Sequence, residues 1–134
     1  MNILHTETLF GWGGEQNKVL KEMLFMRERG GHNVFLFCNP DSQIALRAQN
    51  LDFEVITCKM SKKTYPQSIF ALLKTIKSNQ ISLVISHAST DSWVCAITRM
   101  ILKVVGFPCV FMRERHNCYP IKGFASKIIA QIPL

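Results

Sequence analysis

The sequence predicts an α/β domain in which a mainly parallel sheet of about five strands carries helices on both faces. Short apolar runs alternate along the chain with segments whose apolar residues recur at helical spacing, and this order implies right-handed crossovers between parallel strands. The strand-like runs are apolar without polar alternation, as expected for strands buried on both sides. The length of 134 residues suits one such domain. We therefore predict a Rossmann-like, three-layer α/β/α architecture.

Five short apolar runs are the expected strands, and turn residues or glycines bound most of them. They cover residues 2–6, 33–38, 53–57, 81–86 and 109–112. The segments that follow them have the longer, amphipathic or apolar pattern of helices. These cover residues 15–29, 42–50, 66–78, 89–105 and 122–132.

The predicted helix ends rest on residues with known terminal preferences. Gly30-Gly31 ends the first helix in the manner of a glycine C-cap, and Gly106 stops the fourth. The turn Asn39-Pro40-Asp41-Ser42 supplies the cap of the second helix, and Pro66 suits the start of the third.

Composition excludes several classes of protein. Apolar residues make up 48% of the chain, enough for a core, so global disorder is not expected. The five cysteines are irregularly spaced, without C-x-x-C or zinc-ligand spacing, so we expect reduced thiols in a cytoplasmic protein and no metal site. No secretory signal or membrane-length apolar run is present. P-loop and nucleophile-elbow motifs are absent as well.

The charge is unevenly distributed along the chain. Residues 1–58 carry five Lys/Arg and seven Asp/Glu, a net of −2, whereas residues 59–134 carry eleven and two, a net of +9. A basic half favours a phosphate-bearing or polyanionic partner, or an anionic membrane surface. The alternative is a merely solvated basic face. Its members would be Lys59, Lys62, Lys63, Lys74 and Lys77.

Ligands of open parallel sheets bind beyond the carboxyl ends of the strands, which singles out the loop after the first strand. There Gly13, Gly14 and Glu15 follow Gly11-Trp12 and open a helix, so the backbone could approach an anion closely. The alternative is a tight turn that simply needs glycine. A dinucleotide site is disfavoured, because Gln16 stands where the third glycine of G-x-G-x-x-G belongs.

A second candidate loop follows the fourth strand. His87, Ser89 and Asp91 combine an imidazole, a hydroxyl and a carboxylate that could bind a polyol or a diphosphate. Helix capping alone would explain Ser89 and Asp91, but it would not explain His87.

The third candidate loop follows the fifth strand. Arg113 and Arg115 could bind phosphate or carboxylate groups, and His116 could act as an acid–base group near neutral pH. Alternatively, Glu114 pairs with one of the two arginines. Among the other histidines, His5 fits a satisfied core position, and His32 fits a surface turn.

Four passages together resemble the N-terminal domain of family-4 GT-B glycosyltransferases, the retaining type common in cell-envelope polysaccharide synthesis. They are NILHTETLFGWGGEQNKVL, RERGGHNVFLFC, LVISHASTDSW and VGFPCVFMRERH. Their order and spacing match the family's first strand and glycine turn, its Arg-Gly-His passage, the histidine after strand four, and the Gly-x-Pro strand that ends in histidine. The resemblance covers essentially the whole chain.

The resemblance implies roles for the candidate residues. Gly13 and Gly14 would lie near the donor diphosphate, and His116 would lie near the transferred sugar. The acceptor side would be lined by His87, Ser89 and Asp91. Such enzymes move a sugar from a nucleotide-sugar to an acceptor, often a lipid-linked one. The basic half would then suit docking at the inner face of an anionic membrane.

One departure from the family is large. Its second domain, which binds the nucleotide-sugar and carries an E-x7-E motif, has no counterpart in residues 1–134. We therefore expect a single acceptor-side domain that is truncated at its C-terminal end and inactive alone, and we expect no cofactor. The alternative function is a basic Rossmann-like module for a dinucleotide, a phosphorylated ligand or nucleic acid. No recognition-helix or stacking-aromatic pattern favours nucleic acid.

Overall fold

Strands and helices alternate throughout the part of the chain that the computed structural model describes, residues 1–8, 11–60, 65–87 and 89–114. The elements are β1 (Asn2–Glu7), α1 (Gly14–Glu28), β2 (Asn33–Cys38), α2 (Gln43–Asn50), β3 (Glu54–Thr57), α3 (Tyr65–Ser78), β4 (Leu83–Ser86), α4 (Ser89–Val105) and β5 (Val110–Arg113). The predicted helix over 122–132 lies outside the described residues.

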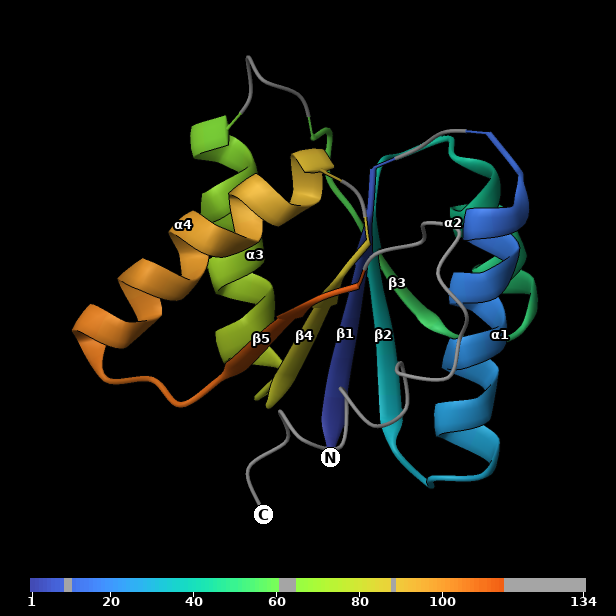
Figure 1. Ribbon diagram of the computed structural model, residues 1–134, viewed down its shortest axis with the longest axis horizontal. Coiled ribbons are helices and arrows are strands. Elements are labelled where there is room, and N and C mark those ends of the chain that lie inside the picture. Colours follow the sequence, from blue (N-terminus) through green and yellow to red (C-terminus); the bar gives the residue numbers. More distant parts are fainter. Residues whose placement is uncertain (9–10, 61–64, 88, 115–134) are drawn as a thin grey trace.

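The five strands form one parallel sheet in the order β3-β2-β1-β4-β5. Helices α1 and α2 cover one face, and α3 and α4 cover the other (Figure 1). The first three strands are added in one direction, from β1 to β3. The fourth strand, β4, is then placed on the other side of β1, so the strand order reverses between β3 and β4. The predicted Rossmann-like α/β fold is thereby confirmed. All strand carboxyl ends reach the same edge, at the top of Figure 1.

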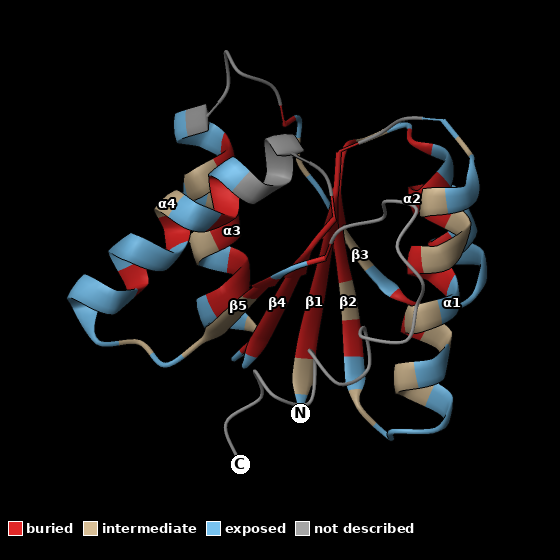
Figure 2. Ribbon diagram, viewed as in Figure 1, coloured by how far each residue is buried: buried red, intermediate tan, exposed pale blue. Residues whose placement is uncertain are grey.

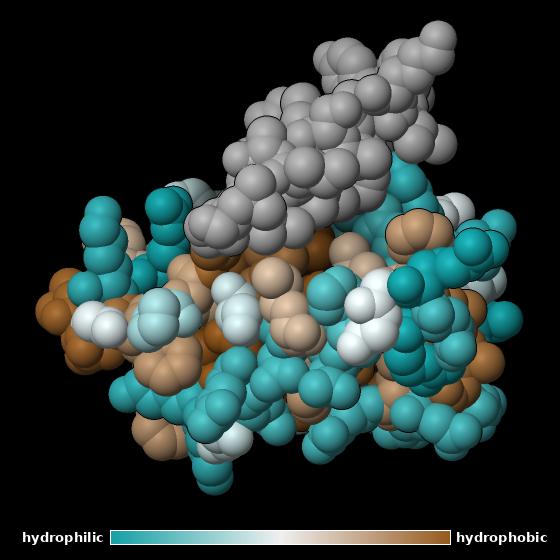
Figure 3. Space-filling model, turned by 90° about the horizontal axis from the view of Figure 1, so that it is seen from below, coloured by the Kyte–Doolittle hydropathy of each residue, from teal (hydrophilic) through white to brown (hydrophobic). Residues whose placement is uncertain are grey.

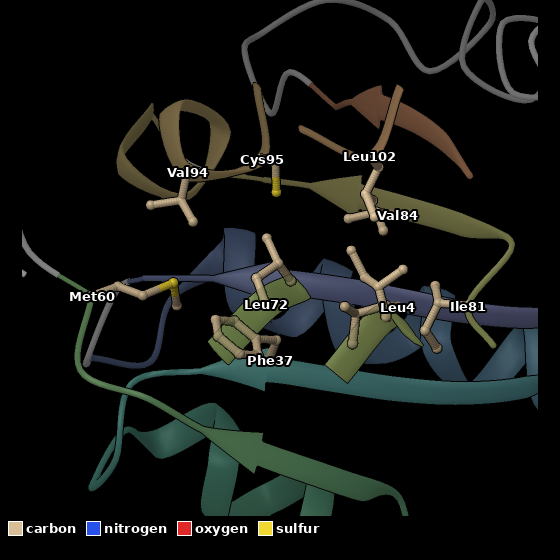
Figure 4. Close-up of a cluster of buried hydrophobic side chains, with 10 residues drawn as sticks. Leu4, Phe37, Met60, Leu72, Ile81, Val84, Val94, Cys95 and Leu102 are labelled. Carbon is tan, nitrogen blue, oxygen red and sulfur yellow. The ribbon is translucent and has the colours of Figure 1, made fainter. Parts of the chain in front are cut away.

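A separate core lies on each face of the sheet, and the central strands β1 and β4 between them are almost wholly buried (Figure 2). Under α3 and α4, Leu4 and Val84 of the central strands meet Leu72 and Leu102 of the two helices (Figure 4). Under α1 and α2, the apolar stripe predicted for the first helix packs on β2. That cluster is centred on Val19, Met23, Leu36 and Ile44. Burial of both strand faces explains why the strand sequences show no polar alternation.

The helix ends follow the predicted residues with small shifts. Ser42 caps α2, because its Oγ accepts a hydrogen bond from the Ala45 N–H at 3.3 Å. Helix α1 ends at Glu28, slightly before the prediction, and Gly31 takes the left-handed turn with a φ of 64°. Gly106 has a φ of 78° and stops α4 as predicted. Both conformations favour glycine, since a Cβ would be strained there.

The strand boundaries also shift by one or two residues. Strand β1 reaches Glu7, whereas β4 begins at Leu83 because the Ile81 N–H is still bonded to the Ile76 carbonyl of α3, at 3.0 Å. The described cysteines carry free thiols, and burial raises the pKa of Cys38 to about 11 and that of Cys109 to about 12. These two thiols are therefore protonated near neutral pH.

Candidate functional site

The described members of the three predicted loops meet at one edge of the sheet. Gly13 and Gly14 follow β1, His87 follows β4, and Arg113 ends β5, all at the carboxyl ends of parallel strands. Helix α4 begins at Ser89, which places Ser89 and Asp91 in its first turn at this edge, although their side chains are outside the description. Arg115 and His116 lie outside the described residues.

The glycine loop presents an open helix N-terminus. Gly13 is the residue before α1 and has extended backbone with a φ of −152°, and no described side chain caps the helix. Gly13 and Gly14 are exposed, so the first backbone N–H groups of α1 can reach a ligand. Trp12 is held beneath the guanidinium of Arg47, whose carbon lies 4.0 Å from the ring centroid. This contact anchors the loop to α2.

Behind this rim lies a buried polar network. His5 Nδ1 lies 2.9 Å from His87 Nε2, and His87 Nδ1 lies 3.4 Å from Glu114 Oε2. Lys18 Nζ of α1 lies 3.9 Å from the other oxygen of Glu114. The two imidazole rings are stacked, with an interplanar angle of 6°. The network therefore joins β1, the ends of β4 and β5, and α1.

Two carboxyl groups share this interior. The pKa of Glu114 is raised to about 9, first by burial and then by the adjacent Glu22 carboxyl, while Lys18 lowers it by less. Burial likewise raises the pKa of Glu22. The contact with Lys18, at 3.9 Å, would favour an ionised Glu114. Because the lysine side chain is one-third exposed, its effect on the pKa is weaker than that of the adjacent Glu22 carboxyl. We conclude that one proton sits between the two carboxyl groups at neutral pH.

The network was only partly predicted. His5 is fully buried with a polar partner, as its sequence position indicated, but His87 is also buried instead of open to the rim. Glu114 faces inward towards Lys18 and His87, while the neighbouring Arg113 is exposed. Of the two arginines expected as possible partners of Glu114, Arg113 is therefore not the partner, and Arg115 lies outside the described residues. Successive side chains at a strand end point to opposite sides, which explains the difference.

An open groove of about 420 Å³ lies on the other side of β5, between this strand and α4. Its apolar surface comes from Trp93, Ala96 and Phe111, and its charge comes from Arg99 and Arg113. A hollow that combines an indole ring with two guanidinium groups suits a ligand with an apolar or sugar face and an anionic group.

Helix α4 is apolar on its outer surface as well as towards the core. Met100 is 69% exposed and Val104 86% exposed, and Ile101 and Val105 lie beside them. Seen from below, a brown patch marks this side of the molecule (Figure 3), the side on which α4 ends in Figure 1. Within the described residues, no helix is both long and apolar enough to cross a membrane.

Comparison with solved structures identifies proteins of similar fold. The chain is similar to a glycosyltransferase from Rickettsia africae ESF-5, with a TM-score of 0.71 and 14% identity over 98% of this chain and 34% of that one. It is also similar to the lipopolysaccharide outer core galactosyltransferase WaaB in its apo form, with a TM-score of 0.64 and 16% identity over 87% of this chain and 33% of the other.

A third similar structure is MurG from Acinetobacter baumannii, with a TM-score of 0.63 and 10% identity over 95% of this chain and 39% of that chain. No protein-family model matches the sequence, and no curated protein sequence matches it. The chain thus has the fold of a GT-B glycosyltransferase N-terminal domain, as the sequence resemblance indicated, and it spans less than two fifths of the length of these structures.

Proposed function

We propose that this chain is the acceptor-side part of a retaining, family-4 glycosyltransferase that acts in cell-envelope glycan synthesis. It would work with a domain that binds the nucleotide-sugar, and it would have no transferase activity alone. The fold likeness to three glycosyltransferases supports the class of reaction. The limited share of their length that the chain spans supports the need for a second domain.

One observation carries this proposal: two open features lie at the same carboxyl edge of the sheet. The uncapped N-terminus of α1 at Gly13 and Gly14 suits the diphosphate of a sugar donor, because exposed backbone N–H groups and the helix dipole favour anions. The groove with Trp93 and Arg113 suits an acceptor with an anionic group. Donor and acceptor would then meet over β1 and β4.

The remaining candidate residues take roles around this meeting point. Glu15 and Gly14 begin α1 beside the donor phosphates, and Ser89 and Asp91 line the acceptor from the first turn of α4. Arg115 would assist Arg113 with the acceptor's anionic group, and His116 would lie near the transferred sugar. His87 would hold the end of β4 in place through Glu114, because its side chain has no exposed surface.

The outer surface of α4 suggests where a lipid-linked acceptor would be met. Its apolar residues lie beside Arg99 and Lys103, which are exposed, so the helix could rest on an anionic membrane surface. The groove opens along the same helix. A membrane at α4 would therefore deliver a lipid-linked acceptor directly to Trp93 and Arg99.

The proposal is tested by transfer from a radiolabelled nucleotide-sugar to lipid-linked or phosphorylated glycan acceptors. The chain is assayed alone and together with a GT-B donor-binding domain, fused or added separately. We expect product only in the combined assay. Tight, saturable nucleotide-sugar binding by the chain alone would contradict the division of labour between the two domains.

The alternative function, a basic module for nucleic acid, makes a different prediction in the same preparation. Its affinity for single- or double-stranded nucleic acid would fall steeply with salt, because phosphate contacts release counterions. Such binding, without any transfer in the combined assay, would replace the glycosyltransferase proposal.

A further inference from the structure

Three side chains with metal-binding atoms converge behind the carboxyl edge of the sheet. They are His5 of β1, Glu22 of α1 and His87 after β4, and one ligand atom of each lies within 4.8 Å of the other two. The two histidine nitrogens, Nδ1 of His5 and Nε2 of His87, are only 2.9 Å apart. The three residues come from three different parts of the chain, so their spacing in the sequence does not predict a metal site.

Two imidazole nitrogens and one carboxylate form a donor set that suits zinc and the neighbouring transition metals. Ligand atoms at about 2.0–2.2 Å from such an ion lie about 3–3.5 Å from one another. The two nitrogens are already close to that separation. The Glu22 carboxylate would have to move by about 1 Å, which its long side chain on α1 allows.

A second observation points to a cation at the same place. Both carboxyl oxygens of Glu22 are buried. The group beside them is the Glu114 carboxyl, to which Glu22 is hydrogen-bonded. Two acidic groups buried side by side are unfavourable, and a bound cation would stabilise them.

The surroundings also contain the support that a histidine ligand needs. Glu114 Oε2 lies 3.4 Å from His87 Nδ1, on the side of the ring opposite the shared Nε2. A carboxylate behind a ligating histidine orients the ring and raises its basicity. Lys18 lies 3.9 Å from the other oxygen of Glu114 and offsets part of the remaining charge.

We propose that His5 Nδ1, His87 Nε2 and the Glu22 carboxylate bind one divalent transition-metal ion of the zinc class, with Glu114 as the carboxylate that positions His87. On binding, both rings stay neutral and carry their protons on the nitrogens that face away from the ion, Nε2 of His5 and Nδ1 of His87, while the proton held by the carboxyl pair passes to solvent. The ion ties α1 to β1 and to the end of β4. Because its ligands are buried, it is a structural ion.

The test uses the complete chain, freed of metal with a chelator and titrated with Co²⁺ and with Zn²⁺. We expect one ion per chain, visible Co²⁺ absorption of a nitrogen–oxygen site, and proton release measured by calorimetry in two buffers. The thermal midpoint should rise by about 10 °C when Zn²⁺ is about 100-fold above its Kd.

Two variants and one control locate the ion. His87→Gln and Glu22→Gln should each weaken binding at least tenfold, and Glu22→Gln keeps the shape of the side chain should His87→Gln fail to fold. His32→Gln, a histidine in the turn between α1 and β2, should leave binding unchanged. The proposal is overturned by absence of saturable binding, by thiolate-to-metal charge transfer from the cysteines, or by unchanged binding in Glu22→Gln.

Discussion

Nδ1 of His87 lies 3.4 Å from Oε2 of Glu114, and neither side chain has exposed surface. The residue after β4 and the residue after β5 are therefore joined inside the protein, directly behind the edge where the three candidate loops lie. A change in the ionisation of Glu114 therefore affects the contact between these two strand ends. Because His87 also contacts His5, the change reaches β1 as well.

The raised pKa of Glu114 predicts a specific pH dependence of stability. The folded protein holds this proton up to about pH 9, whereas the ordinary pKa of a glutamate side chain is 4.5. The contribution of Glu114 to stability is therefore fully present below pH 4.5 and is lost as the pH rises through 9, because the folded state binds more protons than the unfolded state. Urea unfolding from pH 5 to 9 should show the decline.

Glu114→Gln isolates this effect. The amide keeps the shape of the carboxylic acid but cannot ionise, so the free energy of unfolding should become flatter from pH 5 to 9 and exceed that of the wild type at pH 9. Glu22, Glu15, Lys18 and the two buried histidines also face this region, so Glu28→Gln, at the exposed end of α1, is the matched control. Chelator is present throughout. A Glu114→Gln profile as steep as the wild type would contradict the assignment.

The backbone conformation of Gly106 leads to a second prediction, which concerns the free energy of unfolding. Its φ of 78° is strained for any residue with a Cβ, although the space around it is open. Gly106→Ala should lower the free energy of unfolding by about 1 kcal/mol. Gly11→Ala, also in open space and without a positive φ, should change it by less than about 0.5 kcal/mol. Equal effects in urea unfolding would show that the conformation of Gly106 is not the cause.

The fold could be predicted from the sequence because each element depends on local signals. The unbroken apolar run of residues 34–38 marks a strand buried on both faces, and β2 does occupy that position. Ser42 marks a helix start by its own side chain. The boundaries were less accurate, because the hydrogen bond from Ile81 to α3 that delays β4 depends on a contact between elements.

The buried network could be predicted only in part, because its members come together through the topology of the sheet. Lys18 and Glu22 have the spacing of an ordinary polar helix face, and nothing local shows that this face turns towards the strand ends. Glu114 stands between two arginines in the sequence, which suggested a neighbouring pair. The alternation of side chains at the end of β5 separates it from Arg113 and directs it inward.

Gly14 makes a prediction about the donor. Nothing lies within 4 Å of a Cβ placed there, so Gly14→Val should leave the thermal midpoint within about 3 °C of the wild type. In the combined assay with a donor-binding domain, the added methyl groups would keep a diphosphate from the backbone of α1, and kcat/KM for the nucleotide-sugar should fall at least about tenfold. Lys21→Val, on the exposed surface of the same helix, should leave kcat/KM unchanged.

The outer surface of α4 predicts binding to membranes. The double variant Met100→Ser, Val104→Ser replaces two strongly exposed apolar side chains and should weaken binding to anionic phospholipid vesicles at least about fivefold, measured by co-sedimentation. Phe25→Ser and Leu46→Ser, in exposed positions on the opposite face of the sheet, form the control pair. Equal losses in both pairs, or equal binding to neutral vesicles, would place the contact elsewhere.

The groove between α4 and β5 leads to the last prediction, which concerns binding of the acceptor. Arg113 and Trp93 line it from opposite walls, one with a guanidinium group and one with an indole face. Arg113→Ala should raise KM for a phosphorylated acceptor at least about tenfold in the combined assay, because a charge-assisted contact is lost. Arg113→Lys should recover only part of the loss, since an ammonium group lacks the fork of donors. Trp93→Ala should raise KM for charged and uncharged acceptors alike. Arg29→Ala, exposed at the far end of α1, should change neither, and a similar effect in Arg29→Ala would assign the loss to overall charge instead of to the groove.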